Sequence, residues 1–175
     1  MTSRLLLSLA LLAALVAPAA QGQTVPTEAW FLRYTWTPNQ DSIAGLPVRA
    51  INRRWHKALV LTPALFPAMS HDDSAEVREY VWGVGGDLNH DGSPDSVLTG
   101  VFAGSGGPGR FLLVLSRNPT GRWQPVFVKT TADGAGFSAL SVREGQIYWM
   151  GCMSCGDQSH LLPTSAGFRL EYEGD

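Results

Sequence analysis

Apolar and polar residues alternate with a period of two along most of the chain from Phe111 onward. Residues 168–173 (FRLEYE) show this most cleanly, because apolar and charged side chains alternate at every position. A period of two is typical of a β-strand that buries one face. On this pattern and on apolar content we predict strands at 77–84, 95–102, 111–116, 125–130, 137–142, 146–150 and 168–173.

The links between these predicted strands are short and rich in glycine, proline, asparagine and aspartate. They are SGGPG at 105–109, RNPTGR at 117–122, TADGAG at 131–136 and REG at 143–145. Such residues favour tight turns. Parallel strands need a crossover of about a dozen residues or more, so short links favour antiparallel neighbours. The sequence therefore predicts a mainly β (α+β) fold built on an antiparallel meander sheet.

One stretch before these strands has a helical pattern. In LPVRAINRRWHKAL, Val48, Ile51, Trp55 and Leu59 fall near one face of a helix, and Pro63 ends any helix soon afterwards. The pattern predicts an N-terminal helix whose apolar stripe packs on one face of the sheet.

The first 22 residues are typical of a secretory signal peptide. Arg4 precedes an apolar run over 5–16, and small residues follow it. The run falls short of the roughly 20 residues that cross a bilayer, so we expect no membrane insertion of the mature chain. The protein is then periplasmic or secreted, with residues 23–175 forming a single β-rich domain of ordinary size.

Charge excludes one class of partner. The chain carries a formal net charge of −2, and loss of residues 1–22 removes one basic residue and no acidic one. A slightly acidic protein without a basic patch gives no reason to expect binding to nucleic acid.

The stretch GDLNHDGSPDSVL at 86–98 contains the clearest chemical pattern. Asp87, Asn89, Asp91 and Asp95 occupy positions 1, 3, 5 and 9 of a loop, and Ser93 at position 7 offers a backbone carbonyl. Calcium takes six to eight oxygen ligands, which loops supply from alternate positions. The pattern predicts one calcium ion held by these five residues. The alternative is a metal-free turn in which Asp and Asn side chains cap backbone amides.

The same residues resemble a known family. DLNHDGSPDSVL is similar to the D-x-N-x-D-G-x-x-D calcium loop of FG-GAP and VCBS-type repeats, which implies the same five ligands at 87–95. Those repeats build β-propellers of about four to eight blades, whereas this chain has one such loop. It more nearly resembles a small exported bacterial protein with a single FG-GAP-like loop.

Cys152 and Cys155 are the only cysteines, and export favours a disulfide between them. Their spacing is also that of thioredoxin-like redox motifs, but a strand-like run precedes Cys152 rather than a helix N-terminus. A structural disulfide is therefore the favoured interpretation. A zinc site would need two further ligands, and His160 is the only nearby candidate.

Two other motifs lead to weaker hypotheses. AGSGGPGR at 103–110 lacks the Lys-Ser or Lys-Thr of a phosphate loop and is interpreted as a hairpin turn. Ser70, His71, Asp72 and Asp73 are adjacent, whereas catalytic triads assemble from separated residues.

Together these features favour an exported calcium-binding module, non-enzymatic, that serves a binding or structural role with a protein or glycan partner. The alternative is an enzyme, either a secreted hydrolase or a thiol–disulfide protein that uses Cys152 and Cys155.

Overall fold

The computed structural model describes residues 34–66, 80–151, 158–165 and 167–173. The fold is mainly β, with antiparallel sheets, which confirms the predicted class. The strands and helices are β1 (Ser42–Ile43), β2 (Leu46–Pro47), α1 (Val48–Ile51), β3 (Trp55–Val60), the 3-10 turn η2 (Pro63–Leu65), β4 (Tyr80–Val81), β5 (Gly83–Gly86), β6 (Asp95–Gly104), β7 (Gly107–Arg117), β8 (Trp123–Thr131), β9 (Ala139–Arg143), β10 (Gln146–Met150), β11 (Gln158–Thr164) and β12 (Gly167–Glu173).

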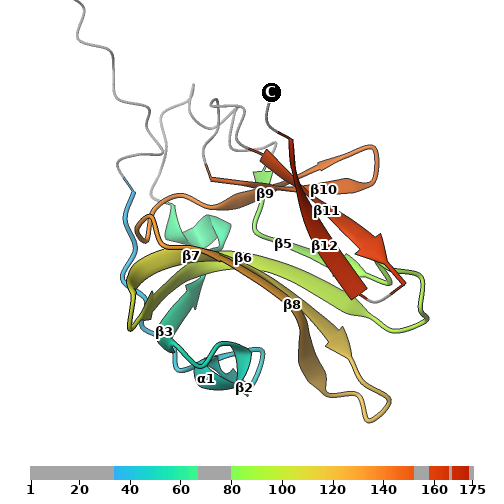
Figure 1. Ribbon diagram of the computed structural model, residues 1–175, viewed down its shortest axis with the longest axis horizontal. Coiled ribbons are helices and arrows are strands. Elements are labelled where there is room, and N and C mark those ends of the chain that lie inside the picture. The colour runs from blue at the N-terminus through green and yellow to red at the C-terminus, as the bar shows by residue number, and fades with distance from the viewer. Residues whose placement is uncertain (1–33, 67–79, 152–157, 166, 174–175) are drawn as a thin grey trace, which may run out of the picture.

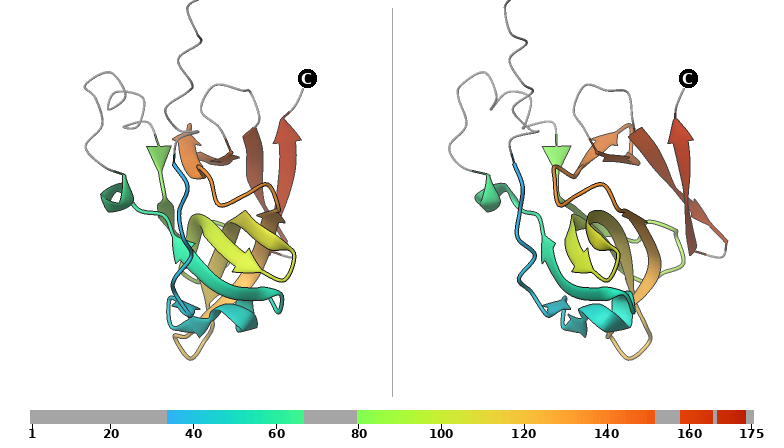
Figure 2. Two further views of the ribbon diagram at one scale, coloured as in Figure 1. Left: turned by 90° about the vertical axis from the view of Figure 1, so that its left-hand side faces the viewer. Right: turned by 60° about the vertical axis from the view of Figure 1, so that its left-hand side comes forward.

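Two larger sheets face each other (Figures 1 and 2). The first, here the central sheet, has the order β3-β6-β7-β8, and β5 pairs with the same long strand β6 as β3 does. The second, here the C-terminal sheet, has the order β12-β11-β10-β9-β4. Strands β5 to β8 and strands β9 to β12 pair consecutively as meanders, as predicted. In contrast, β3 joins β6 and β4 joins β9 from distant parts of the chain, and the second layer of the fold is another sheet.

Two apolar clusters lie between the sheets. In one, Leu59 and Val101 of the central sheet meet Ala139 of the C-terminal sheet. In the other, Val97, Leu112 and Val114 from the central sheet meet Leu140, Ile147, Trp149 and Leu161 from the C-terminal half of the chain. Burial of such side chains stabilises a fold by about 25 cal/mol for each Å² removed from water.

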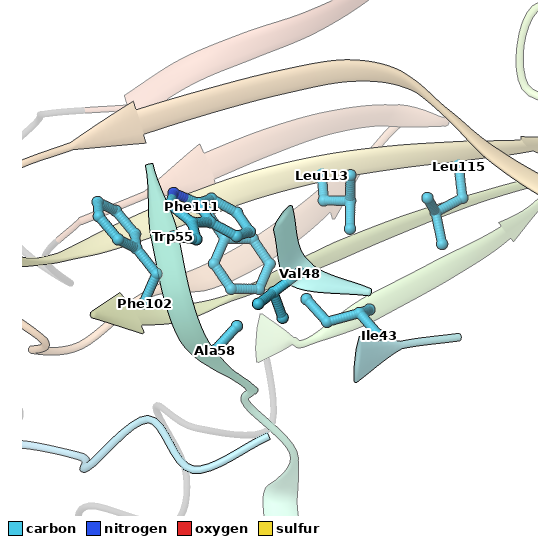
Figure 3. Close-up of a cluster of buried hydrophobic side chains, with 8 residues drawn as sticks. All are labelled: Ile43, Val48, Trp55, Ala58, Phe102, Phe111, Leu113 and Leu115. Atoms are coloured by element: carbon cyan, nitrogen blue, oxygen red, sulfur yellow. The ribbon is translucent and has the colours of Figure 1, made fainter. Parts of the chain in front are cut away.

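The opposite face of the central sheet is also buried. Alternate residues of β7 point there, and β1, β2 and α1 cover them (Figure 3). Trp55 and Phe102 stack with ring centroids 5.0 Å apart in the cluster on that face. Strand β7 is thus apolar on both faces, because it lies between two layers.

The predicted N-terminal helix is wrong for most of its length. Helix α1 covers only Val48–Ile51, and Trp55–Val60 forms strand β3, which pairs with β6. The helical spacing failed because two of the apolar residues serve different cores: Trp55 lies in the cluster of Figure 3, and Leu59 packs on the other side. Pairing with a long central strand outweighed helix periodicity.

The remaining strand predictions were largely confirmed, whereas the short strands β1 and β2 and the longer strand β11 were not predicted. Strand β10 has the predicted bounds, and β6 to β9 and β12 overlap their predicted segments. Strand β11 was missed because its residues Gln158–Thr164 contain polar side chains on both faces and a proline. Of the segment 77–84, residues 80–84 are described and contribute to β4 and β5, with the switch between sheets at Trp82.

The signal-peptide prediction (residues 1–22) and the candidates at 70–73 lie outside the described residues. The same is true of Cys152 and Cys155, so their predicted disulfide stays a prediction. Within the described ranges, no helix has the length and apolar character needed to cross a membrane.

Candidate metal centre

The acidic loop is the connection of the β5–β6 hairpin. Gly86 at the end of β5 is the register partner of Asp95 at the start of β6, so residues 87–94 form the loop between paired strands. The pairing brings the first and last of the predicted ligands, Asp87 and Asp95, to the same end of the hairpin.

The carboxylate of Asp87 organises the first half of the loop. Its Oδ1 accepts a hydrogen bond from the amide of Asp91 at 3.1 Å, and its Oδ2 accepts one from the amide of Gly92, also at 3.1 Å. Gly92 has φ of +86° and His90 has φ of +59°, so the backbone turns sharply at both positions. Glycine adopts a positive φ without steric penalty, whereas His90 adopts a conformation that residues with a Cβ rarely take.

Asn89 and Asp91 form a second set of contacts. The Asn89 amide donates to Asp91 Oδ2 at 2.9 Å, and Asp91 Oδ1 accepts from the amide of Ser93 at 2.7 Å. The Asn89 hydrogen bond, followed by that from Ser93, lowers the pKa of Asp91 below its ordinary value of 3.8. Asp91 is therefore an exposed, ionised carboxylate at neutral pH.

Asp95 differs from the other two aspartates because it is only 2% exposed. Its Oδ2 accepts a hydrogen bond from the amide of Leu88 at 3.0 Å. Its Oδ1 is buried and makes no hydrogen bond to any described residue. Leaving such an oxygen without a partner costs about 1–3 kcal/mol, and more for a charged group. Among the described features of the loop, this unpaired buried carboxylate oxygen is the one that most favours a bound cation.

The aspartates alone do not form a finished metal cage. Within the described part of the chain, no three His, Cys, Asp or Glu side chains are grouped closely enough to hold a metal ion. Asp87 and Asp91 are directed at amides of their own loop. Each carboxylate oxygen has two lone pairs, so an oxygen that accepts one amide retains a site for an ion. A complete set would also need the amide oxygen of Asn89 and the carbonyl of Ser93.

A polar groove of about 430 Å³ lies beside this loop. Asn89, His90, Asp91 and Ser93 form one wall. Facing them are residues from the end of β7 and its turn, from β8, and from the β11–β12 turn, including Arg117, Gln124 and Thr164. Sequence reasoning missed this second wall. Its residues lie tens of positions from the loop and follow no common spacing, so only the fold brings them together.

A larger cavity of about 570 Å³ lies elsewhere, next to Arg110. Burial lowers the pKa of the Arg110 guanidinium, which is paired with Asp133. Its Nη1 also donates to the carbonyls of Phe137 at 3.0 Å and Gly151 at 2.6 Å. Arg110 thus connects β7 to Asp133, Phe137 and Gly151, and each of its three guanidinium nitrogens donates to a protein group.

The other sequence candidates have ordinary structural roles. The glycine cluster forms the tight β6–β7 hairpin, as predicted. His160, the candidate zinc ligand, stacks on Tyr148 with ring centroids 4.8 Å apart.

Comparisons with protein-family models, with curated proteins and with solved structures find no match to this chain. Conclusions about function therefore rest on the residues and their geometry.

Proposed function

We propose that this protein is an exported, non-enzymatic binding or structural module that holds one calcium ion in its β5–β6 loop. The ligands are the side chains of Asp87, Asn89, Asp91 and Asp95 and the backbone carbonyl of Ser93. The observation that carries the proposal is the buried Oδ1 of Asp95, which lacks a protein partner among the described residues.

Calcium fits this set better than other common ions. All five groups offer oxygen, and calcium and magnesium are the hard cations that prefer oxygen. Magnesium demands near-ideal octahedral geometry and retains its waters, whereas calcium tolerates the irregular geometry of a flexible loop. Extracellular calcium modules work at about 10⁻⁴ to 10⁻³ M, so a weak site suits a protein that leaves the cytoplasm.

Binding would also remove a repulsion. Two unit charges at about 5 Å cost roughly 3 kcal/mol at an effective dielectric constant of 20, and less where water reaches them. Asp87 and Asp91 are drawn to neighbouring positions by the Asp91 amide, which donates to Asp87. A divalent ion between the carboxylates converts this repulsion into attraction.

Calcium binding by the loop is tested by thermal unfolding of the mature protein with calcium and with chelator. We expect calcium to raise Tm, by an amount that corresponds to about 2.7 kcal/mol at a hundredfold excess over the dissociation constant. Asp91→Ala should abolish the increase, because it removes an exposed carboxylate of the proposed site.

Asp41→Ala is the matched control. Asp41 is an exposed aspartate that pairs with Lys57, far along the chain from the loop. This variant should keep the full calcium response. A Tm that neither calcium nor chelator changes would refute the proposal.

Export, the Cys152–Cys155 disulfide and a protein or glycan partner belong to the same proposal. The enzymatic alternative gains no support from the described residues.

A further inference from the structure

The cavity of about 570 Å³ beside Arg110 has the size of a small-ligand site, since such sites measure roughly 300–1,000 Å³. Three parts of the chain that are far apart in the sequence form most of its lining: residues 34–38, the start of β7, and residues 133–137 between β8 and β9. The backbone amide of Trp36 donates to the carbonyl of Ala135 at 3.0 Å, so the first and the last of these segments lie side by side (Figures 1 and 2). The cavity is therefore a product of the fold and not of a single loop.

Two aromatic residues of the lining are held in place by packing. The rings of Tyr34 and Trp36 stack with centroids 5.8 Å apart. Trp36 also meets the ring of Phe66 edge to face, 5.0 Å away, and both residues pack against the apolar cluster that contains Val101. Both stay half-buried. Because these rings are already fixed, an apolar ligand face that packs on them orders few side chains.

The polar part of the lining is the ion pair between Arg110 and Asp133. The Nε of Arg110 donates to Oδ1 of Asp133 at 3.0 Å, and its Nη2 pairs with Oδ2, so both carboxylate oxygens are fixed. The carboxylate is the more exposed partner, with 45% of the Asp133 side chain accessible against 15% for Arg110. Each carboxylate oxygen retains a second lone pair. The pair therefore offers two neighbouring hydrogen-bond acceptors.

The charges of the lining favour a neutral ligand. Arg110 and Asp133 are the only charged residues among the described lining residues, and they compensate each other. The guanidinium disfavours a cation, and the exposed carboxylate disfavours an anion. A neutral molecule with two adjacent donors and an apolar face fits the acceptors and the rings together. Neighbouring hydroxyls and the C–H face of a sugar ring have this combination, and the exposed Thr35 and Thr37 add hydroxyls that both donate and accept.

We propose that this cavity binds a neutral saccharide, with one ring face on Tyr34 and Trp36 and two adjacent hydroxyls that donate to the Asp133 carboxylate. The inference rests on the binding role in the proposed function and names the class of partner. It uses none of the proposed calcium ligands, since no residue of the loop at 87–95 lines the cavity. Saccharide binding should therefore be independent of calcium.

The test is a glycan array that carries neutral and uronic-acid-containing oligosaccharides, probed with the mature protein in millimolar calcium and again with chelator. Calorimetry then measures the dissociation constant of the neutral glycan that gives the strongest array signal. We expect neutral glycans to bind equally in both buffers. Gly136→Leu should fill the cavity and weaken binding by about tenfold or more. The backbone accepts this change, because a Cβ on Gly136 would come no closer than 4.0 Å to the Tyr34 carbonyl oxygen and the φ of Gly136 is not left-handed.

Gly106→Leu is the matched control. A Cβ on Gly106 meets nothing within 4 Å, and Gly106 does not line this cavity. This variant should bind the glycan as the parent protein does, and thermal unfolding checks that both variants remain folded. NMR of the parent protein locates the glycan without any substitution. Its addition should shift the indole N–H resonance of Trp36 and the amides of 133–137, and leave those of 87–95 unchanged.

The inference and the calcium proposal fail separately. Absence of glycan binding, binding confined to acidic glycans, or binding that chelator abolishes overturns the saccharide site. Unweakened binding by folded Gly136→Leu, or resonance shifts in the loop at 87–95 instead of at Trp36, also overturns it. None of these results changes the calcium proposal. A Tm that calcium does not affect refutes the calcium ion and leaves the saccharide site standing.

Discussion

At the scale of single residues, Asp95 makes the sharpest prediction. In the absence of calcium its charge is buried at 2% exposure with only one oxygen hydrogen-bonded to the described chain, which destabilises the fold. Asp95→Asn removes the charge and keeps an acceptor for the Leu88 amide. We expect this variant to be at least as stable as the parent in chelator, and to lose calcium affinity by about tenfold or more.

Urea unfolding with and without calcium measures both effects, and the order of stability should reverse between the two conditions. Asp41→Asn, at an exposed position, should change neither. A variant that is destabilised equally with calcium and with chelator would show that Asp95 has only a structural role.

Asp91 yields a pH-dependent prediction in the calcium-free protein. Its pKa lies below the ordinary 3.8, chiefly because Asn89 donates to the carboxylate. The native carboxylate holds its proton more weakly than the unfolded one, so its contribution to stability is present above pH 3.8 and is lost as the pH falls through the native pKa. Carboxyl NMR titration should show Asn89→Ala raising the pKa toward 3.8, whereas Asn118→Ala should leave it unchanged.

At the scale of elements, strands were predictable from the sequence wherever one face is buried and the other is exposed to water. Strand β12 alternates because Phe168 and Leu170 pack against an apolar cluster between the sheets, whereas Arg169 and Glu171 are exposed. Strand β3 was not predictable, because its apolar residues serve two cores and their spacing imitates a helix. Local pattern carries no information about which distant strand a segment joins.

The candidate site, too, was only partly predictable from the sequence. The acidic loop could be found in the sequence because its proposed ligands follow one another at alternate positions, whereas the opposite wall of the groove could not. Arg117 is the last residue of β7 in the central sheet, and Thr164 is the last residue of β11 in the C-terminal sheet. The burial of Asp95 was equally hidden, since it depends on strand β6 entering the core directly after the loop.

Gly100, which is paired with both neighbouring strands of the central sheet, gives a prediction at this scale. A Cβ on Gly100 in β6 would overlap the Leu59 carbonyl of β3 and lie 2.6 Å from the Phe111 ring of β7. Gly100→Ala should therefore force neighbouring strands apart and destabilise the fold by about 1–3 kcal/mol. Gly106→Ala is the control, because a Cβ there meets nothing within 4 Å. Thermal or urea unfolding compares the stabilities of the two variants. Equal stabilities would contradict the close packing of β3 and β7 against Gly100.

At the scale of the whole molecule, a buried polar cluster joins the two halves of the fold. Thr99 lies in β6 of the central sheet, and its hydroxyl contacts that of Ser138, which precedes β9. The indole N–H of Trp149 in β10 donates to Thr99 at 3.2 Å and to Ser138 at 2.8 Å. This polar link between the sheets is thus centred on one tryptophan beside an apolar cluster.

Trp149→Phe tests that link against a matched tryptophan. Trp82 is buried to the same degree, at 5% against 6% exposure, but its indole N–H has no hydrogen-bond partner among the described residues. Both substitutions remove similar volume, whereas only Trp149→Phe removes an indole donor that two buried hydroxyls share; these hydroxyls keep their contact with each other. Because an intramolecular hydrogen bond contributes about 0.5–1.5 kcal/mol, Trp149→Phe should be destabilising by about that much more than Trp82→Phe. Urea unfolding of both variants gives the difference directly, and equal losses would mean that packing alone holds the two sheets together.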